Sequence, residues 1–244
     1  MSVIRRLLSV ALFPFLIALL SAIACYWASG NSFGLFIGGL VVVTIIVPIV
    51  SMAEALIVNR LVATAFVLCP ICAVWLLGTS RAEIYVHEWF GSVLILAGYA
   101  IGLVGLAAGL RIARCSSVVS AAVSVIVGLL WLTSPIWLSV TWNGSDSEAG
   151  VARLVMLHPG MAINAQVDKL GAWSGQSVAY HLTVLQQDVM YALPHNYWPC
   201  LLFHSILGGA LLGLAWWVTG RGVAVSTCPS IVQTAPSATR NSAI

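Results

Sequence analysis

The sequence contains few charged residues. Asp, Glu, Lys and Arg make up 7% of its 244 residues, whereas soluble domains carry about a quarter. Hydrophobic residues make up 61% of the chain and the mean hydropathy is +1.03. These values exclude an ordinary soluble domain and indicate a protein that crosses a membrane several times.

Lysine is almost absent. The single lysine, Lys169, lies in "QVDKL" and is not preceded by a glycine-rich loop. A P-loop needs a lysine in the pattern G-x-x-x-x-G-K-[ST] to hold nucleotide phosphates. The chain therefore cannot bind ATP through a P-loop.

Long apolar runs dominate the rest of the sequence. A helix needs about 20 apolar residues to cross the hydrocarbon core of a membrane. Six stretches meet this requirement: 7–29, 34–57, 61–79, 91–110, 117–140 and 197–219. We therefore expect an all-α, polytopic membrane helix bundle. The six-span domain covers residues 1–220, including a long connection at 141–196, and the tail at 221–244 is predicted to be disordered.

Basic residues predict the orientation, because positively charged loops stay in the cytoplasm. If the N-terminus is cytoplasmic, seven of the ten basic residues fall on that side: Arg5, Arg6, Arg60, Arg111, Arg114, Arg221 and Arg240. We expect both termini to be cytoplasmic. The first span follows Arg5 and Arg6 and ends in "SAIAC", which we interpret as an uncleaved signal anchor.

The connection at 141–196 is predicted to hold short helices at the outer interface. Ser145 and Glu148 have capping-box spacing ahead of "VARLVML" and predict one helix that stops before Pro159. "GMAINAQVDKL" predicts a second, closed by Gly171, and Pro159 and Gly160 in "LHPGMAIN" form the turn between them. "SVAYHLTVLQQDVMYAL" carries an apolar stripe at helical spacing and predicts an amphipathic lid helix that ends before Pro194.

Histidines are the first candidate site residues. Imidazole binds zinc, copper and iron, so the outer histidines are candidate metal ligands: His87, His158, His181 and His195. Their spacing lacks a paired-ligand motif, since "HEWFG" has glycine where H-E-x-x-H needs a second histidine. Interfacial histidines that bond to backbone or water are the commoner alternative. We also take His158, Asn164, His195 and Glu54 as substrate or gating candidates, Glu54 being the only acid inside a predicted span.

Two further patterns lie inside predicted spans. Cys69 and Cys72 in "CPIC" share one helix face and are candidates for a dithiol redox centre; packing around a proline kink is the alternative. The fourth span carries small residues at spacings typical of close helix packing: Gly98, Gly102, Gly105 and Gly109.

The layout resembles the permease subunit of ABC-2-type transporters. It shares six spans, cytoplasmic termini and short helices between the last two spans, with "LHPGMAIN" as a proline-containing helix start after the fifth span. The resemblance implies a separate ATP-binding subunit. It also implies a cytoplasmic coupling segment between spans two and three. If the second span ends near Val50, this segment is "SMAEALIVNR", and Glu54 is the acidic residue that contacts the ATP-binding subunit.

Three functions follow from these features. The first is a permease-like transport protein acting with an ATP-binding subunit in the lipid bilayer, in a bacterial inner membrane. The second is a membrane redox or metal enzyme built on Cys69, Cys72 and the outer histidines. The third is a non-catalytic assembly or scaffold protein that uses the glycine face of the fourth span and the amphipathic lid helix as partner surfaces. We expect no cofactor and no nucleic-acid partner, and a homo-oligomer is a further expectation.

Overall fold

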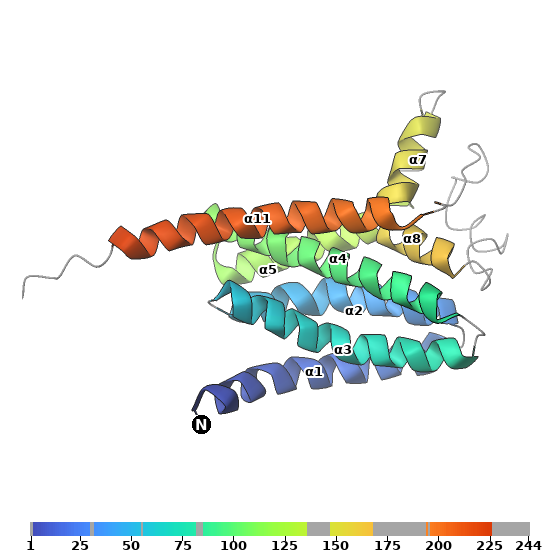
Figure 1. Ribbon diagram of the computed structural model, residues 1–244, viewed down its shortest axis with the longest axis horizontal. Coiled ribbons are helices and arrows are strands. Elements are labelled where there is room, and N and C mark those ends of the chain that lie inside the picture. Colours follow the sequence, from blue (N-terminus) through green and yellow to red (C-terminus); the bar gives the residue numbers. More distant parts are fainter. Residues whose placement is uncertain are drawn as a thin grey trace, which may run out of the picture.

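A computed structural model shows a bundle of long helices (Figure 1). It describes residues 2–29, 32–54, 56–81, 85–135, 147–167, 194 and 196–225. The helices in these ranges are α1 (Ser2–Ser29), α2 (Ser32–Ala53), α3 (Ile57–Arg81), α4 (Val86–Ile112), α5 (Ser117–Leu132), α7 (Ser147–Leu157), α8 (Pro159–Gln166) and α11 (Trp198–Val225). The described residues contain no strand, so the all-α prediction is confirmed for them.

Four of these helices are long and apolar enough to cross a membrane. The qualifying stretches are Leu35–Ala53, Ile57–Gly78, Val86–Ile112 and Trp198–Thr219. The described apolar stretches of α1 and α5, Leu12–Trp27 and Ser117–Leu132, are shorter. The structure is therefore that of a membrane-compatible helical bundle, in which four of the six predicted spans have the required length and composition.

The helices α2 and α4 form the centre of the bundle. Helix α2 contacts α1, α3, α4 and α5, and α4 contacts α3, α5, α8 and α11. Consecutive long helices run in opposite directions, so the N-terminus and the last turns of α11 lie at the same end (Figure 1). The buried core between the helices is mostly apolar, with Phe36 packed against Trp75 at 4.6 Å between ring centroids.

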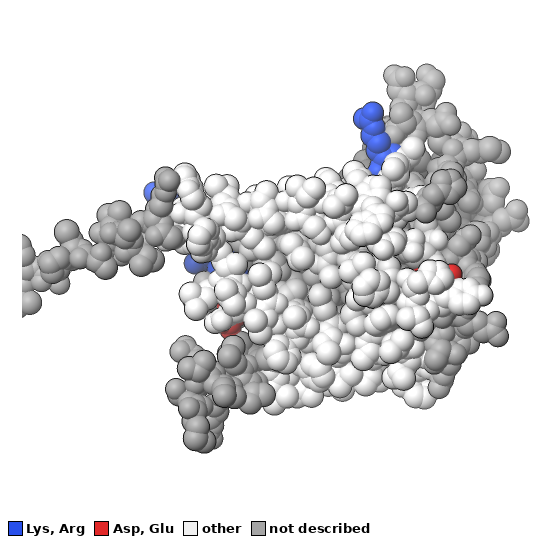
Figure 2. Space-filling view, in the orientation of Figure 1, with Lys and Arg blue, Asp and Glu red and all other residues white. Residues whose placement is uncertain are grey.

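Charge on the described surface is confined to the two ends of the bundle. On the face shown in Figure 2, Lys, Arg, Asp and Glu lie near one end or the other, and the broad surface between them is uncharged. This is the distribution expected where hydrocarbon surrounds the middle of a protein. We call the end that holds Arg60, Arg111 and Arg114 the basic end, and the end that holds α7 and α8 the opposite end.

The connection between α2 and α3 differs from both predictions made for it. Helix α2 ends at Ala53 and α3 begins at Ile57, so Glu54 follows the span and does not lie inside it. Because α2 continues beyond Val50, the link is too short to form the ten-residue coupling segment that the resemblance implied. The α4–α5 link is also tight: Arg114 adopts a left-handed φ of 63°, and Ser116 caps α5 by accepting a bond from the Val119 amide.

The first two predicted helices of the long connection are present as α7 and α8. Helix α8 begins at Pro159, at the turn expected in "LHPGMAIN", and ends at Gln166, before the end predicted at Gly171. It does not lie on the surface, because its residues from Pro159 to Asn164 are buried and it packs against α4, α2 and α7. The predicted lid helix at 177–193 and most of the tail at 221–244 lie outside the described residues, although α11 continues to Val225.

Candidate functional site

His158 joins α8 to the end of α5. Its backbone is extended, with φ −78° and ψ 124°, and its Nδ1 accepts a hydrogen bond of 3.2 Å from the Met161 amide, so it caps α8. Nδ1 is an acceptor, so the proton resides on Nε2, which donates to the Leu132 carbonyl at 3.1 Å. Both ring nitrogens are thus engaged.

The ring of His158 faces the bundle and is 4% exposed. Burial lowers its pKa to about 4, so the imidazole is neutral at physiological pH. A neutral ring suits the two hydrogen bonds that it makes, because protonation of Nδ1 would remove the acceptor used by the Met161 amide. His158 is therefore a brace whose bonds depend on its neutral form.

Helix α8 closes the bundle at the opposite end. Met161, Ala162 and Ile163 are each 2% exposed or less, and α8 lies against both central helices. A side chain on Gly160 would lie 3.0 Å from the His158 ring, so the small residue permits the tight junction. We call α8 with its cap His158 the plug. Asn164, in the last turn of α8, is 5% exposed and belongs to it.

An aromatic and polar cluster lies beneath the plug, and the sequence predicted no role for it. Trp131 on α5 stands between the two histidine rings, 5.9 Å from His158 and 6.3 Å from His204 between centroids. His204 packs edge-on against Tyr99 at 5.4 Å, and the Tyr99 hydroxyl lies 3.0 Å from the Thr44 hydroxyl. The sequence signal was a histidine inside the last span, which is costly in lipid unless it faces protein.

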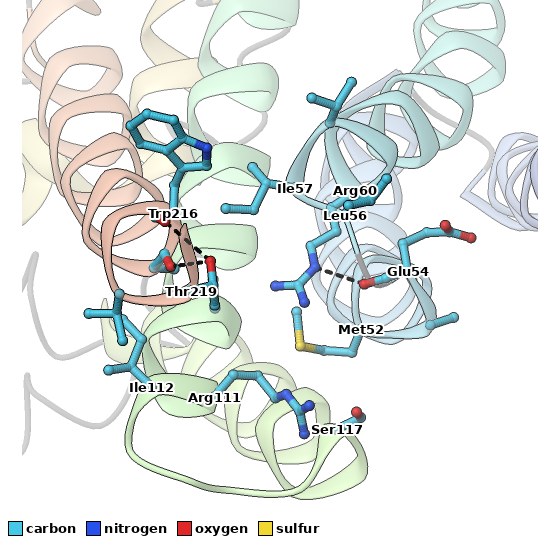
Figure 3. A pocket seen from close by; sticks show the side chains of 15 residues that line it. Met52, Glu54, Leu56, Ile57, Arg60, Arg111, Ile112, Ser117, Trp216 and Thr219 are labelled. Atoms are coloured by element: carbon cyan, nitrogen blue, oxygen red, sulfur yellow. Dashed lines mark hydrogen bonds between the residues drawn. The ribbon is translucent and has the colours of Figure 1, made fainter. Parts of the chain in front are cut away.

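A cavity of about 800 Å³ lies at the basic end. Five helices contribute to it: the end of α2, the start of α3, the end of α4, the start of α5 and the last turns of α11. Figure 3 shows residues of α3 and α11 on facing sides, with Ile57 and Arg60 across from Trp216 and Thr219. Most of the lining side chains are apolar.

The charged groups at this cavity do not form a simple ion pair. Arg60 donates from Nε to the backbone carbonyl of Glu54 at 2.9 Å, and its guanidinium points into the cavity (Figure 3). The Glu54 carboxylate points away from the cavity, and its Oε2 accepts a hydrogen bond of 3.2 Å from the side-chain amide of Asn59. Arg111, at the edge next to Ser117, donates to the Cys115 carbonyl at 3.1 Å. Glu54 therefore positions Arg60 through its backbone and leaves the positive charge facing the space.

The structure does not assemble the candidate metal ligands that it describes. His87 is exposed and stacks on Tyr85 at 5.6 Å between centroids, while His158 uses both nitrogens in hydrogen bonds. His181 and His195 lie outside the described residues. Within the described ranges, no group of three or more His, Cys, Asp or Glu residues is close enough to hold a metal ion.

The two cysteines of "CPIC" lie on α3 as free thiols. Cys69 is exposed and Cys72 is partly buried, and the Cys72 carbonyl accepts a 3.3 Å bond from the Trp89 indole. The backbone next to Cys72 is therefore used to join α3 to α4.

The four glycines of α4 form its contact with α11. A methyl group on Gly98 would lie 2.7 Å from Leu201, and one on Gly109 would lie 3.2 Å from Leu211. At the middle of the seam, a methyl group on Gly105 would lie 2.5 Å from the Cα of Gly208. The glycine face is thus occupied by a helix of the same chain.

These features define the class of the protein as a helical bundle with four helices long and apolar enough to span a membrane, a cavity at one end and a plug at the other. Comparison of the chain with protein families, with curated proteins and with solved structures finds no match.

Proposed function

We propose that the protein is a permease-like transport subunit that takes its energy from a separate ATPase. The observation that carries this proposal is the asymmetry of the bundle: an 800 Å³ cavity lies at the basic end, while the plug is buried between the central helices at the opposite end. Transporters that work by alternating access need a substrate space accessible from one side while the other side is closed.

The proposed topology has six spans, α1 to α5 and α11, with both termini in the cytoplasm. The start of α3, with Arg60, and the turn from α4 into α5, with Arg111 and Arg114 beside it, lie at the same end as the start of α1 (Figure 1), and such basic ends stay in the cytoplasm. The cavity then faces the cytoplasm and the plug faces outward. A bacterial inner membrane remains the proposed location.

The plug is the proposed outer gate. Opening the bundle outward requires α8 to leave α2 and α4, which breaks the His158 bond to the Leu132 carbonyl. Each such bond contributes about 1 kcal/mol net, and re-exposing the apolar side chains of α8 adds to the cost. In the proposed cycle the separate ATPase supplies this free energy, because the chain has no P-loop lysine.

The layout also supports the ABC-2-type resemblance in one respect and departs from it in another. A proline-initiated helix, α8, follows the fifth long helix, which agrees with the proline-containing helix start that the resemblance implied. The missing coupling segment means that an ATPase would contact the short α2–α3 and α4–α5 links, which hold Glu54 and Arg114.

The scaffold alternative loses one of its two proposed surfaces, because the glycine face of α4 packs against α11; the other, the lid helix, lies outside the described residues. No described observation favours the redox or metal enzyme over transport.

Accessibility of the plug tests the proposal. The variant Ala162→Cys places a thiol at a position that is fully buried, and Arg153→Cys places one on the exposed side of α7 as a control. We expect a membrane-impermeant maleimide, added from the outside, to label position 153 at all times. Position 162 should be labelled only when a co-purified ATPase turns over ATP.

Adducts are located by mass spectrometry, with the unsubstituted protein as the reference for its own cysteines. If position 162 stays unlabelled during ATP turnover, or if no Walker A protein co-purifies with the native chain, the proposed function is wrong.

A further inference from the structure

We propose that the cavity at the basic end binds an anionic amphiphile: its phosphate contacts Arg60 and Arg111, and its hydrocarbon chain lies along the apolar wall between α3 and α11. This goes beyond transport as proposed above, because the site is defined by its own geometry. If the bound amphiphile is also the transported molecule, that role rests on the proposed function.

The cationic groups have capacity for a ligand. Arg60 uses Nε for the Glu54 carbonyl and Arg111 uses one Nη for the Cys115 carbonyl. In the part of the chain that the structure describes, neither guanidinium forms an ion pair with a carboxylate. A guanidinium has five N–H donors in a planar fork that matches phosphate oxygens, so donors remain on both side chains.

The two arginines bring like charges to one cavity. Arg60 and Arg111 both line it, and Arg60 is partly buried beside apolar side chains. Repulsion and loss of water are both relieved when an anion lies between or beside the two guanidinium groups. Glu54 does not provide that anion, because its carboxylate bonds to Asn59 and points away from the cavity.

The walls of the cavity distinguish an amphiphile from a small ion. Ile57 of α3 faces α11, and Ile112 and Val218 contribute further hydrocarbon to the lining. A site for free phosphate needs mostly polar donors, whereas a pocket that is mainly apolar with a few converging polar groups suits a ligand with both characters.

Depth in the membrane supports the same ligand. The cavity lies where the apolar stretch Leu35–Ala53 ends and the stretch Ile57–Gly78 begins. The ends of apolar spans lie at the level of the phospholipid headgroups. Trp216 is 69% exposed at this level, and tryptophan collects where headgroups meet hydrocarbon. Basic pockets between helices on the cytoplasmic side bind anionic headgroups.

Binding is tested on the full chain in detergent by native mass spectrometry during titration with phosphatidylglycerol. Phosphatidylcholine supplies the same chains without net charge, and inorganic phosphate supplies the charge without chains. We expect saturable binding of phosphatidylglycerol, at least tenfold weaker binding of phosphatidylcholine, and no competition by inorganic phosphate at concentrations that match the lipid.

Variants locate the site. Loss of one charge-assisted contact to phosphate weakens binding by about tenfold or more, so we expect that loss for Arg60→Gln and Arg111→Gln. Arg60→Lys should recover part of it, because the charge is retained. The matched control is Arg114→Gln, which removes an exposed arginine from the same end but outside the cavity lining.

The outcomes separate the alternatives. Equal binding of the two lipids, or equal losses for Arg114→Gln and Arg60→Gln, would overturn the site. Effective competition by inorganic phosphate would overturn the amphiphile and leave an anion site. If Arg60→Gln fails to fold, Arg111→Gln decides alone, because Arg111 is exposed. No ATPase is present in this experiment, so a failed plug-accessibility test does not affect its result.

Discussion

The contact between α4 and α11 allows a sharp prediction about two adjacent glycines. A Cβ on Gly208 would lie 2.7 Å from the Gly102 amide nitrogen and closer still to the Ile101 carbonyl, whereas a Cβ on Gly209 would meet nothing within 4 Å. Ordinary carbon contacts are about 3.5–4.0 Å. Gly208→Ala therefore forces the two helices apart by about 1 Å, and Gly209→Ala changes no contact.

The magnitude follows from this difference. Both substitutions gain helix propensity of up to about 1 kcal/mol. Only Gly208→Ala adds overpacking, which costs about 1–3 kcal/mol, and the obstructing atoms are backbone, so they cannot rotate away. We expect Gly208→Ala to unfold with a free energy about 1–3 kcal/mol below that of Gly209→Ala.

Denaturant titration in mixed micelles, followed by tryptophan fluorescence, measures both variants under one condition. Gly102→Ala is a second control, because its Cβ would lie 3.5 Å from His204, an ordinary contact, and it should cost much less than Gly208→Ala. Equal free energies of unfolding for the two neighbouring variants would refute the close approach of α4 and α11 at this point.

Three further predictions concern the plug, the cluster beneath it and α3. Burial lowers the pKa of His158 to about 4 from 6.5, so as the pH falls the unfolded chain binds a proton before the folded one does. The free energy of unfolding should therefore stay constant above pH 6.5 and fall by up to about 3 kcal/mol between pH 6.5 and 4. Equilibrium unfolding at several pH values measures this, and the His158→Asn variant should lose most of the pH dependence. In a double-mutant cycle of Tyr99→Phe and Thr44→Val, the 3.0 Å hydroxyl contact should give a coupling of about 1 kcal/mol, and strict additivity would contradict it. A lipid-soluble maleimide should alkylate the exposed Cys69 faster than Cys72. Replacing both cysteines by Ala should leave the transport activity unchanged, and loss of that activity would favour the redox hypothesis.

Much of the bundle was accessible from composition, because a run of about 20 apolar residues leaves few alternatives to a helix. The ends of the helices were less certain. Hydropathy could not place the end of α2, since Glu54 is adjacent to apolar residues on both sides, and the helix ends where the chain must turn back into α3.

The role of the glycines was predictable as a class but not residue by residue. Small residues at regular spacing indicate a close helix contact, and all four glycines do face α11. Which of them is indispensable depends on the crossing point, near Gly105 and Gly208, and a crossing point is a property of two helices far apart in the sequence.

The candidate site was the least predictable part. "LHPGMAIN" indicated a turn, but a local pattern cannot say that α8 enters the bundle, because that depends on space left by α2, α4 and the end of α5. The cavity unites residues of five helices, and nothing in the sequence near Arg60 points to Arg111.

The position of α8 has a consequence for how the chain is synthesised. Its main packing partners α2, α4 and α7 and the Leu132 carbonyl all precede it in the sequence. Because chains emerge from the ribosome N-terminus first, these partners have already been synthesised when the residues of α8 emerge. Helix α11 emerges last and joins α4 along a seam of glycines. A nascent chain halted before residue 198 would therefore carry a seated plug and an open flank on α4, a biogenesis intermediate that the insertion machinery must shield until the final helix arrives.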